Sequence, residues 1–535
     1  MNPSLKPWLS QAFLAALLLG CSGAHAHTSL SQGSLVSAPG LAAQTAPLQP
    51  TIRQCIEAHM GFLASDAMGG RETGTPEGAI TAAYVASVME GMGLQPAGGD
   101  GEFTQNYPLR QSQPDLDTLE LSFGGSEPLV PFEDYNLRGL TEEPIALKGP
   151  VIFAGHGIVD DEAGLDQLAG LNLSGSFVAV LTGVPEGFED LSSRVNSAAK
   201  RDAVAERGAL GLILLSAEDD SRAKRSRDWL GRSATRPRMR LDDGVEPEPV
   251  LVRLYPEPAV AAALFAAAGR SFTEEVERWE AAPLARGFIL DDVTLTLNGN
   301  VKVERFSAEN VAGLLPGVDD ELGQEVIVLS AHMDHVGVNS EGAIHNGADD
   351  NASGTAALLA VAEALATRSE PLRRSVLFLS VSGEEKGLLG SEWWVNNPTL
   401  PIDAVIANIN VDMVGRNDPN SVGITPSPEH EDYNTLVAAA VEAGPAVGLT
   451  VGWSAGEGEY RRRVDTYYGR SDHANFAEKG IPVMFLFAGE HEDYHRPSDT
   501  LDKIDFDKVA KVSRLVEALV ETVAESDERP VALSH

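Results

Sequence analysis

Cysteine is scarce in this chain of 535 residues, which contains only Cys21 and Cys55. Cys21 falls within an expected amino-terminal export signal, where it is either lipidated or removed with the signal. We therefore expect no disulfide to contribute to the stability of the fold. The hydrophobic content of 43% is ample for folding, and the length indicates two to four structural units.

Basic residues are few relative to acidic ones, with 40 against 78 and a formal net charge of -38. Such an excess of acid argues against nucleic acid or an anionic membrane surface as a partner. One segment, residues 222–240, is basic in contrast to the rest of the chain. It contains eight arginines and lysines and one acid, Asp228, which gives a local charge of +7. It is interpreted as a solvated loop that pairs with an acidic face; the alternatives are an exposed processing loop and a lip that steers acidic peptides.

Membrane-spanning segments are not predicted beyond the amino terminus. The apolar run from Ala12 to Gly20 is too short to cross a bilayer, and it predicts an export signal over residues 1–26. Residues 18–21, Leu-Leu-Gly-Cys, resemble a lipobox that would place a lipid on Cys21, whereas residues 24–26 form an A-x-A cleavage site. The lipobox is slightly favoured. We expect an exported protein, either a periplasmic or outer-membrane lipoprotein or a secreted one, with a flexible spacer over residues 27–50.

Strands and helices alternate from Asp291 onward, which predicts a mostly parallel sheet covered on both faces. Four nearly continuous apolar runs are expected to be its central strands: EVIVLSAH, SVLFLSVSG, AVIANINVD and IPVMFLFAG. Each ends at a candidate functional residue. Ligands of open α/β sheets bind outside the carboxyl ends of the strands, so we expect these four ends to form one site.

The first of these strand ends carries His332 and Asp334, and the acids Asp349 and Asp350 stand at the start of the helix GTAALLAVAEAL. Imidazole and carboxylate at a strand end and a helix start are what zinc requires, because it binds nitrogen and oxygen ligands at about 2.0–2.2 Å. The alternative is a polar loop with a helix-capping aspartate.

The other strand ends supply further acids and a histidine. Glu384 and Glu385 are adjacent, and on an extended segment neighbouring side chains point in opposite directions, so one can face a metal and the other the substrate. Asp412 ends an apolar strand, where an unpaired buried charge would be costly. His495 follows Tyr494 after the last strand, and Asp499 is expected to orient the backbone or to hold His495.

Several motifs together resemble the zinc aminopeptidases of family M28. They are FLASDAMGGRETGTPEG near the amino terminus and HMDHVG, GADDNASG, SGEEKGLLGS, NVDMVGR, SDHANFAEKGIPV and YHRPSDT later in the chain. The resemblance covers most of residues 51–130 and 291–525, with no departure at a ligand position. It implies an α/β fold, a mostly parallel mixed sheet flanked by helices, in peptidase segments over residues 51–136 and 291–525, with a tail over 526–535.

The resemblance also implies a role for each of eight residues. His332 and Asp412 would bind one zinc, Glu385 and His495 the other, and Asp350 would bridge the two; Asp334 would orient His332, Glu384 would be the general base, and Tyr494 would donate to the oxyanion. Three carboxylates against two Zn²⁺ leave a charge of +1, which one bridging hydroxide brings to zero. That surplus lowers the pKa of bound water toward about 7.

Residues 137–290 differ in character and resemble the small β-rich protease-associated domain inserted in such peptidases. The apolar segments VIFAGHGIV, GSFVAVLTG and ALGLILLS predict strands, and SAAKRDAVAERG predicts a helix before the last of them. None of these segments has metal-ligand spacing. The isolated His156 is expected to have an ordinary surface or packing role.

The expected function is hydrolysis of the amino-terminal bond of peptides by a dizinc exopeptidase. The alternatives are a carboxypeptidase or a glutaminyl cyclase on the same fold, and a non-catalytic binding protein. The loop around Arg71 and Glu72 is interpreted as structural. His335, His345, His473 and His491 are expected to support the site rather than to bind metal. Asp472 and His473 are candidates for the lining of the substrate pocket, and Ser353 has no nucleophile elbow around it.

Overall fold

The computed structural model describes residues 51–216, 225, 237–244, 250–282 and 285–533. The predicted export signal, the spacer and most of the basic segment 222–240 lie outside the described residues. Two compact units divide the chain: the larger comprises residues up to 109 together with those from 306 onward, and the smaller comprises residues 110–305. The smaller unit contains the predicted insert, 137–290, and extends beyond it at both ends.

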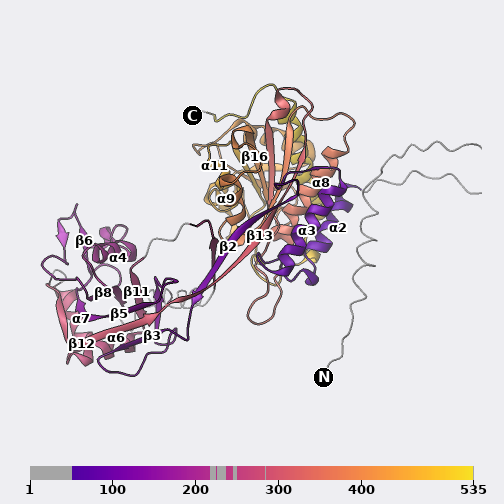
Figure 1. The fold of residues 1–535 in the computed structure, drawn as a ribbon. Helices are drawn as coiled ribbons and strands as arrows, with labels where there is room; N and C mark the ends of the chain where they lie inside the picture. The colour runs from indigo at the N-terminus through magenta and orange to yellow at the C-terminus, as the bar shows by residue number, and fades with distance from the viewer. Residues whose placement is uncertain (1–50, 217–224, 226–236, 245–249, 283–284, 534–535) are drawn as a thin grey trace, which may run out of the picture. The chain divides into compact units, whose positions relative to one another are not determined.

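The larger unit is a mixed sheet between layers of helices, as predicted (Figure 1). Its central strands run in the order β13-β15-β14-β16-β21-β17-β18. The strands are β2 (Thr104–Pro114), β13 (Val301–Leu315), β14 (Val326–His332), β15 (Ser375–Val381), β16 (Val405–Asp412), β17 (Ser421–Thr425), β18 (Thr450–Gly452) and β21 (Val483–Phe487), with the short β1 (Gln95–Pro96), β19 (Ser454–Ala455) and β20 (Arg462–Arg463). Strands β15, β14, β16 and β21 are mutually parallel, so their carboxyl ends meet at one edge.

Helices cover both faces of this sheet, which explains why its central strands are apolar throughout. The helices are α2 (Ile52–Leu63), α3 (Pro76–Gly91), α8 (Gly354–Ala366), α9 (Leu389–Asn396), α10 (Thr435–Ala443), α11 (His473–Ala477) and α12 (Phe506–Glu525). In β14, Ile327 and Leu329 join the core formed with α2, α3, α8 and α12, whereas Val326 and Val328 join the core formed with α9 and α11. Alternate residues of a strand point to opposite faces, so both sets must be apolar.

The smaller unit has its own sheet, in the order β3-β12-β5-β8-β9-β11-β4. Its strands are β3 (Glu120–Phe123), β4 (Tyr135–Arg138), β5 (Ile145–Phe153), β8 (Phe177–Leu181), β9 (Gly211–Leu215), β11 (Val252–Pro256) and β12 (Phe288–Gly299). Strands β6 (Val159–Asp160) and β7 (Leu165–Asp166) pair with each other, and β10 (Arg238–Leu241) pairs with β2. The helices are α4 (Ser197–Ala205), α6 (Pro258–Ala267) and α7 (Phe272–Ala281). The predicted strands and helix of this region are confirmed.

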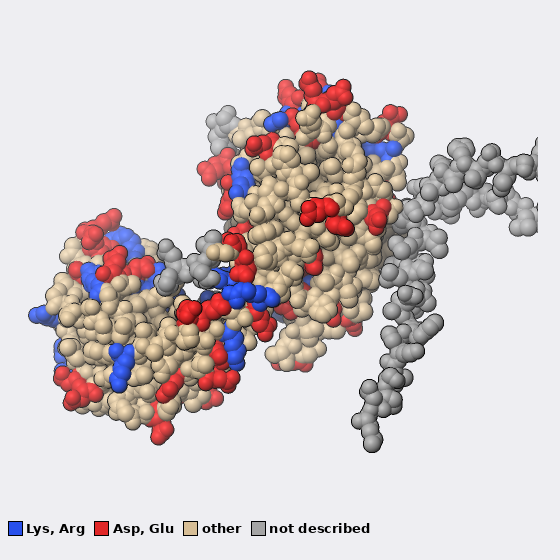
Figure 2. All heavy atoms as spheres, in the orientation of Figure 1, with Lys and Arg blue, Asp and Glu red and all other residues tan. Residues whose placement is uncertain are grey.

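The surface of the larger unit agrees with the acidic composition. Figure 2 shows acidic side chains at several separate places on the visible face of this unit, with fewer basic ones between them. Among the residues that the structure describes, none of the helices is both long enough and apolar enough to cross a bilayer.

Candidate metal centre

Two neighbouring parallel strands bring the first pair of predicted ligands together. His332 is the last residue of β14 and Asp412 the last of β16. The His332 Nε2 atom lies 3.2 Å from an Asp412 carboxylate oxygen, and both residues are buried. The other Asp412 oxygen accepts a hydrogen bond from Ser471 at 2.9 Å. The prediction that strand ends converge is therefore confirmed for this pair.

The loop before α8 carries Asp350 to the same place. α8 begins at Gly354, where a Cβ atom would lie only 2.3 Å from the carbonyl oxygen of Val411, so glycine permits the helix to approach β16 closely. Asp350 then lies between two imidazoles: its carboxylate oxygens are 3.5 Å from His332 Nε2 and 3.1 Å from His495 Nε2. Asp350 thus contacts both His332 and His495.

The two adjacent glutamates follow β15 in a tight turn. Gly383, with φ of +74°, leads into a single 3₁₀ turn over Glu384–Lys386, so the prediction of an extended segment here was wrong. A 3₁₀ turn also separates successive side chains, because it contains only three residues per turn. Glu385 points to His495, with 3.1 Å between its carboxylate and Nε2.

Asp334 lies behind His332, within the protein. His332 Nδ1 lies 3.2 Å from the backbone oxygen of Asp334 and 3.7 Å from its carboxylate. That carboxylate accepts hydrogen bonds from the hydroxyl of Thr73 at 2.8 Å and from the backbone N–H of Glu384 at 3.3 Å. Asp334 therefore touches both His332 and the turn that carries the glutamates.

His335 lies closer to the site than the sequence indicated. It is fully buried, and its Nδ1 lies 2.8 Å from a Glu385 oxygen and 3.7 Å from an Asp350 oxygen. His335, Asp350 and Glu385 together have ligand atoms within 4.8 Å of one another, as do His332, Asp350 and Asp412. Its position one residue after Asp334 was the only signal in the sequence.

Several buried carboxylate oxygens and imidazole nitrogens of the site are better arranged to bind a cation than to form hydrogen bonds with one another. Asp350 Oδ2, Glu385 Oε1, Asp412 Oδ1 and both ring nitrogens of His335 are buried without a well-directed hydrogen bond among the described residues, although some of them lie close together. Buried polar atoms are normally paired, because an unpaired one costs about 1–3 kcal/mol. Imidazole nitrogens and carboxylate oxygens are the ligand atoms that zinc binds, so this donor set suits the metal.

The carboxylates and imidazoles shift one another's ionisation. Burial lowers the pKa of His332, but Asp412 and Glu384 outweigh it and leave that pKa well above its usual range. Burial, together with Glu385, raises the pKa of Asp350. Burial raises the pKa of Glu384 well above that of an ordinary glutamate.

Tyr494 stands at the open side of the site. Its ring stacks on that of His495 with centroids 3.8 Å apart, and burial raises the pKa of its hydroxyl, which stays protonated at neutral pH. The His495 side chain is 38% exposed, whereas the carboxylates of Asp350 and Glu385 are each 4% exposed. Solvent and substrate would therefore enter beside His495.

The remaining candidate residues lie in the protein around the predicted ligands. Asp499 accepts hydrogen bonds from the backbone N–H groups of Asp349 and Asp350 at 3.0–3.1 Å, which is the orienting role expected of it. His491 Nε2 lies 3.3 Å from a carboxylate oxygen of Asp349. Asp472 and His473 are fully buried, so they do not line an open pocket in this structure.

Comparison with known proteins identifies a peptidase family. Residues 310–520 match the sequence model of Peptidase family M28. The chain contains an M28 peptidase domain. Aminopeptidase YwaD of Bacillus subtilis is 26% identical over 213 residues, which are 38% of this chain and 43% of that protein. Leupeptin-inactivating enzyme 1 of Streptomyces exfoliatus is 30% identical over 207 residues, 38% of this chain and 40% of that protein.

The fold also matches the solved structure of an aminopeptidase over most of its length. The aminopeptidase of Aneurinibacillus sp. strain AM-1 aligns with a TM-score of 0.53 and 19% identity, covering 90% of this chain and 96% of that one. At this identity the likeness shows the fold. The chain spans about half the length of the curated relatives that it matches in sequence.

Proposed function

We propose that this protein is an exported dizinc exopeptidase that removes the amino-terminal residue of peptides. The observation that carries the proposal is the convergence of His332, Asp350, Glu385, Asp412 and His495 at the carboxyl edge of the sheet, with buried carboxylate oxygens that have no hydrogen-bond partner among the described residues. The M28 match, and relatives that are named aminopeptidases, favour this activity over the alternatives.

His332 and Asp412 would hold one zinc, Glu385 and His495 the other, and Asp350 would contact both. Two bound Zn²⁺ would supply a Lewis acid for the scissile carbonyl and a lowered pKa for water at the site. The protein's share of the work is to hold these five side chains close together. His332 and Asp412 lie at strand ends, Glu385 lies in a tight turn, and Asp350 and His495 lie in the loops before α8 and after β21.

Glu384 is the proposed general base and acid. Its carboxyl group is adjacent in sequence to the ligand Glu385, and its backbone N–H is fixed by Asp334 at 3.3 Å. Glu384 would take a proton from water and pass it to the leaving amine. Tyr494, protonated at neutral pH and beside His495, would donate a hydrogen bond to the developing oxyanion.

The lipid anchor on Cys21, the export signal and the protease-associated identity of the smaller unit remain proposals from the sequence. Peptides are the proposed substrates. A carboxypeptidase or a glutaminyl cyclase would use the same metal set with another pocket, so the assignment within the fold depends on substrate tests.

Metal analysis combined with a Glu384→Gln variant tests the proposal. We expect the variant to retain about two zinc ions per chain and to lose about 10²–10⁴-fold or more in kcat on aminoacyl chromogenic substrates, because the general base is removed and the ligands are not. Glu363→Gln, at the far end of α8, is the matched control and should keep full activity.

The substrate panel decides between the alternatives. It comprises aminoacyl chromogenic substrates, amino-blocked peptides and carboxyl-blocked peptides. Cleavage confined to amino-blocked peptides would overturn the aminopeptidase assignment. A wild-type protein that binds no zinc and hydrolyses none of the three would be a non-catalytic relative.

A further inference from the structure

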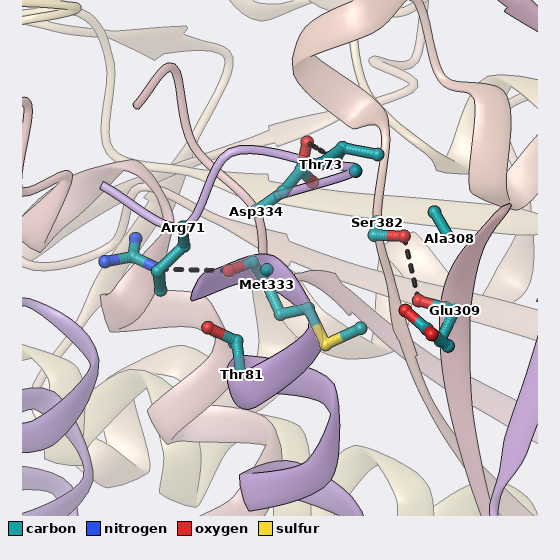
Figure 3. Close-up of a pocket in the computed structure, with 10 residues that line it drawn as sticks. Arg71, Thr73, Thr81, Ala308, Glu309, Met333, Asp334 and Ser382 are labelled. Carbon is teal, nitrogen blue, oxygen red and sulfur yellow. Dashed lines mark hydrogen bonds between the residues drawn. The ribbon is translucent and has the colours of Figure 1, made fainter. Parts of the chain in front are cut away.

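Thr73 links two parts of the metal centre through one hydroxyl group. It lies in the loop between the turn Asp66–Met68 and α3, and it is 3% exposed. Its Oγ1 donates a hydrogen bond to Asp334 at 2.8 Å and accepts one from the backbone N–H of Gly383 at 2.8 Å (Figure 3 shows the first). The hydroxyl therefore both donates and accepts a hydrogen bond within the site.

The two partners of Thr73 lead to different members of the centre. Asp334 contacts His332 through its backbone oxygen and its carboxylate. Gly383 immediately precedes Glu384, the proposed base, and Glu385, a proposed ligand. The hydroxyl thus fixes the strand end that carries one metal ligand relative to the turn that carries another.

The residues on either side of Thr73 hold neighbouring segments of the same site. Arg71 is fully buried, and its guanidinium donates to the carbonyl oxygens of Met333 at 3.0 Å and Gly347 at 2.9 Å, which flank the segments with His332 and Asp350. Glu72 pairs with Lys386 at 2.6 Å, next to Glu385. Arg71 and Thr73 therefore both hold the segment after β14, and Glu72 and Thr73 both hold the turn that carries the glutamates.

We propose that Thr73 is a positioning residue of the metal centre, whose hydroxyl sets the distance between the His332 strand end and the Glu384–Glu385 turn. The proposal rests on the proposed function, since it concerns the same site. Thr73 also lines a small cavity of about 10 Å³ with Asp334 and Ser382 (Figure 3).

The test compares three variants in the full-length protein. Thr73→Val keeps the shape of the side chain and removes both hydrogen bonds, and Thr73→Ser restores the hydroxyl. Thr81→Val is the matched control, because Thr81 is similarly buried nearby on α3, but its hydroxyl bonds only the helix carbonyl of Glu77 at 2.9 Å.

The expected result is a specific loss in Thr73→Val. Its kcat should fall about 10–100-fold with KM changed less than about 3-fold, and its zinc affinity, measured by competition with a chromogenic chelator, should fall about 10–100-fold. Thr73→Ser should recover most of both losses, and Thr81→Val should match the wild type. Equal values for Thr73→Val and Thr81→Val would overturn the proposal.

Amide hydrogen exchange tests the link without zinc or substrate. In metal-free protein, exchange of the segment 382–388 should be faster in Thr73→Val than in Thr81→Val or Thr73→Ser, because the Gly383 N–H loses its acceptor. If the wild type neither binds zinc nor hydrolyses peptides, the proposed function fails, but this comparison still judges Thr73. Unchanged exchange in that segment would refute the link, and if Thr73→Val does not fold, Thr73→Ala takes its place in the comparison.

Discussion

A single aspartate beside the active site illustrates how electrostatics holds the last ligand loop. Asp493 precedes Tyr494 and His495, and it is buried between Lys503 at 2.6 Å and Arg416 at 2.9 Å. Burial would raise the pKa of Asp493, but the hydrogen bonds and charges of its partners outweigh it and depress the pKa well below the usual value. Its charged form therefore stabilises the folded state.

The Asp493→Asn variant should show this contribution as a dependence on pH. Because the folded-state pKa is depressed, the stabilisation is present above the unfolded pKa of about 4 and is lost as pH falls below it. We expect the variant to be less stable than the wild type by about 2 kcal/mol or more at pH 7. The difference should be constant from pH 8 to 5 and should narrow below about pH 4.

Urea denaturation of the two proteins across this pH range measures the difference. Asp502→Asn is the control, since Asp502 is a neighbouring acid on the same loop that bonds Thr500 and is not buried. A gap between Asp493→Asn and the wild type that is the same at pH 7 and pH 3 would contradict the electrostatic explanation.

At the scale of single residues, sequence patterns identified the predicted metal ligands. They did not identify residues that reach the site only because of how the chain folds. His332 and Asp412 stand at the ends of continuous apolar runs, so their convergence followed from strand register. His335 and Thr73 stand in turns, and nothing in their local pattern says which way the chain bends there. Their contacts with Glu385 and Asp334 depend on segments distant in sequence.

At the scale of elements, the helices and strands were predictable and the turns between them were not. The four central strands and α2, α3 and α8 follow from apolar periodicity, which burial on one or two faces dictates. The turn over Glu384–Lys386 was wrongly predicted as extended, because a glycine with positive φ permits a bend that periodicity does not record. The loop around Arg71, interpreted as structural, contacts three segments of the centre.

Arg71 joins several elements of the larger unit through one side chain. Its guanidinium donates to the backbone oxygens of Leu63, Met333, Asn346 and Gly347. Burial lowers the pKa of Arg71 to about 10, which still leaves it charged at neutral pH. The end of α2, the end of β14 and the loop before Asp350 are thus held together by this residue.

Arg71→Met should therefore destabilise the protein strongly. The substitution keeps much of the volume but leaves these carbonyl oxygens without their donor, so we expect a loss of about 3 kcal/mol or more in the free energy of unfolding. Arg53→Met is the control, because Arg53 pairs with Glu57 and Asp507 on the surface, and its loss of stability should be much smaller than that of Arg71→Met. Thermal and urea denaturation measure both, and equal losses would contradict the role given to Arg71.

At the scale of the whole molecule, the two units have separate cores. The cores of the larger unit draw on helices such as α8 and α12, and those of the smaller unit on residues such as Phe153, Phe177 and Trp279. The sequence predicts an inserted unit over residues 137–290, and the smaller compact unit spans residues 110–305. Strands β2 and β13 run without interruption across those positions, so neither composition nor turn residues mark the boundary.

Separate cores and a metal site within only one of them predict a particular calorimetric behaviour. All the candidate ligands, from His332 to His495, belong to the larger unit. A ligand that binds only the folded form stabilises it by RT ln(1 + [L]/Kd), about 2.7 kcal/mol when free zinc is about 100 times Kd. We therefore expect two unfolding transitions in the metal-free protein. Added zinc should raise the midpoint temperature of the larger unit by several degrees and leave that of the smaller unit unchanged.

The variant Asp350→Asn distinguishes this effect from general binding of zinc to an acidic surface. The substituted amide would lack the charge that both metals are proposed to share, so the zinc-dependent rise should largely disappear, whereas the same zinc should still stabilise the control Asp418→Asn. The net charge of -38 gives zinc many weak binding sites on the surface. If the zinc-dependent increase in midpoint temperature persists in Asp350→Asn, the stabilising metal binds elsewhere on the surface. A rise of both transitions together would show that the units unfold as one.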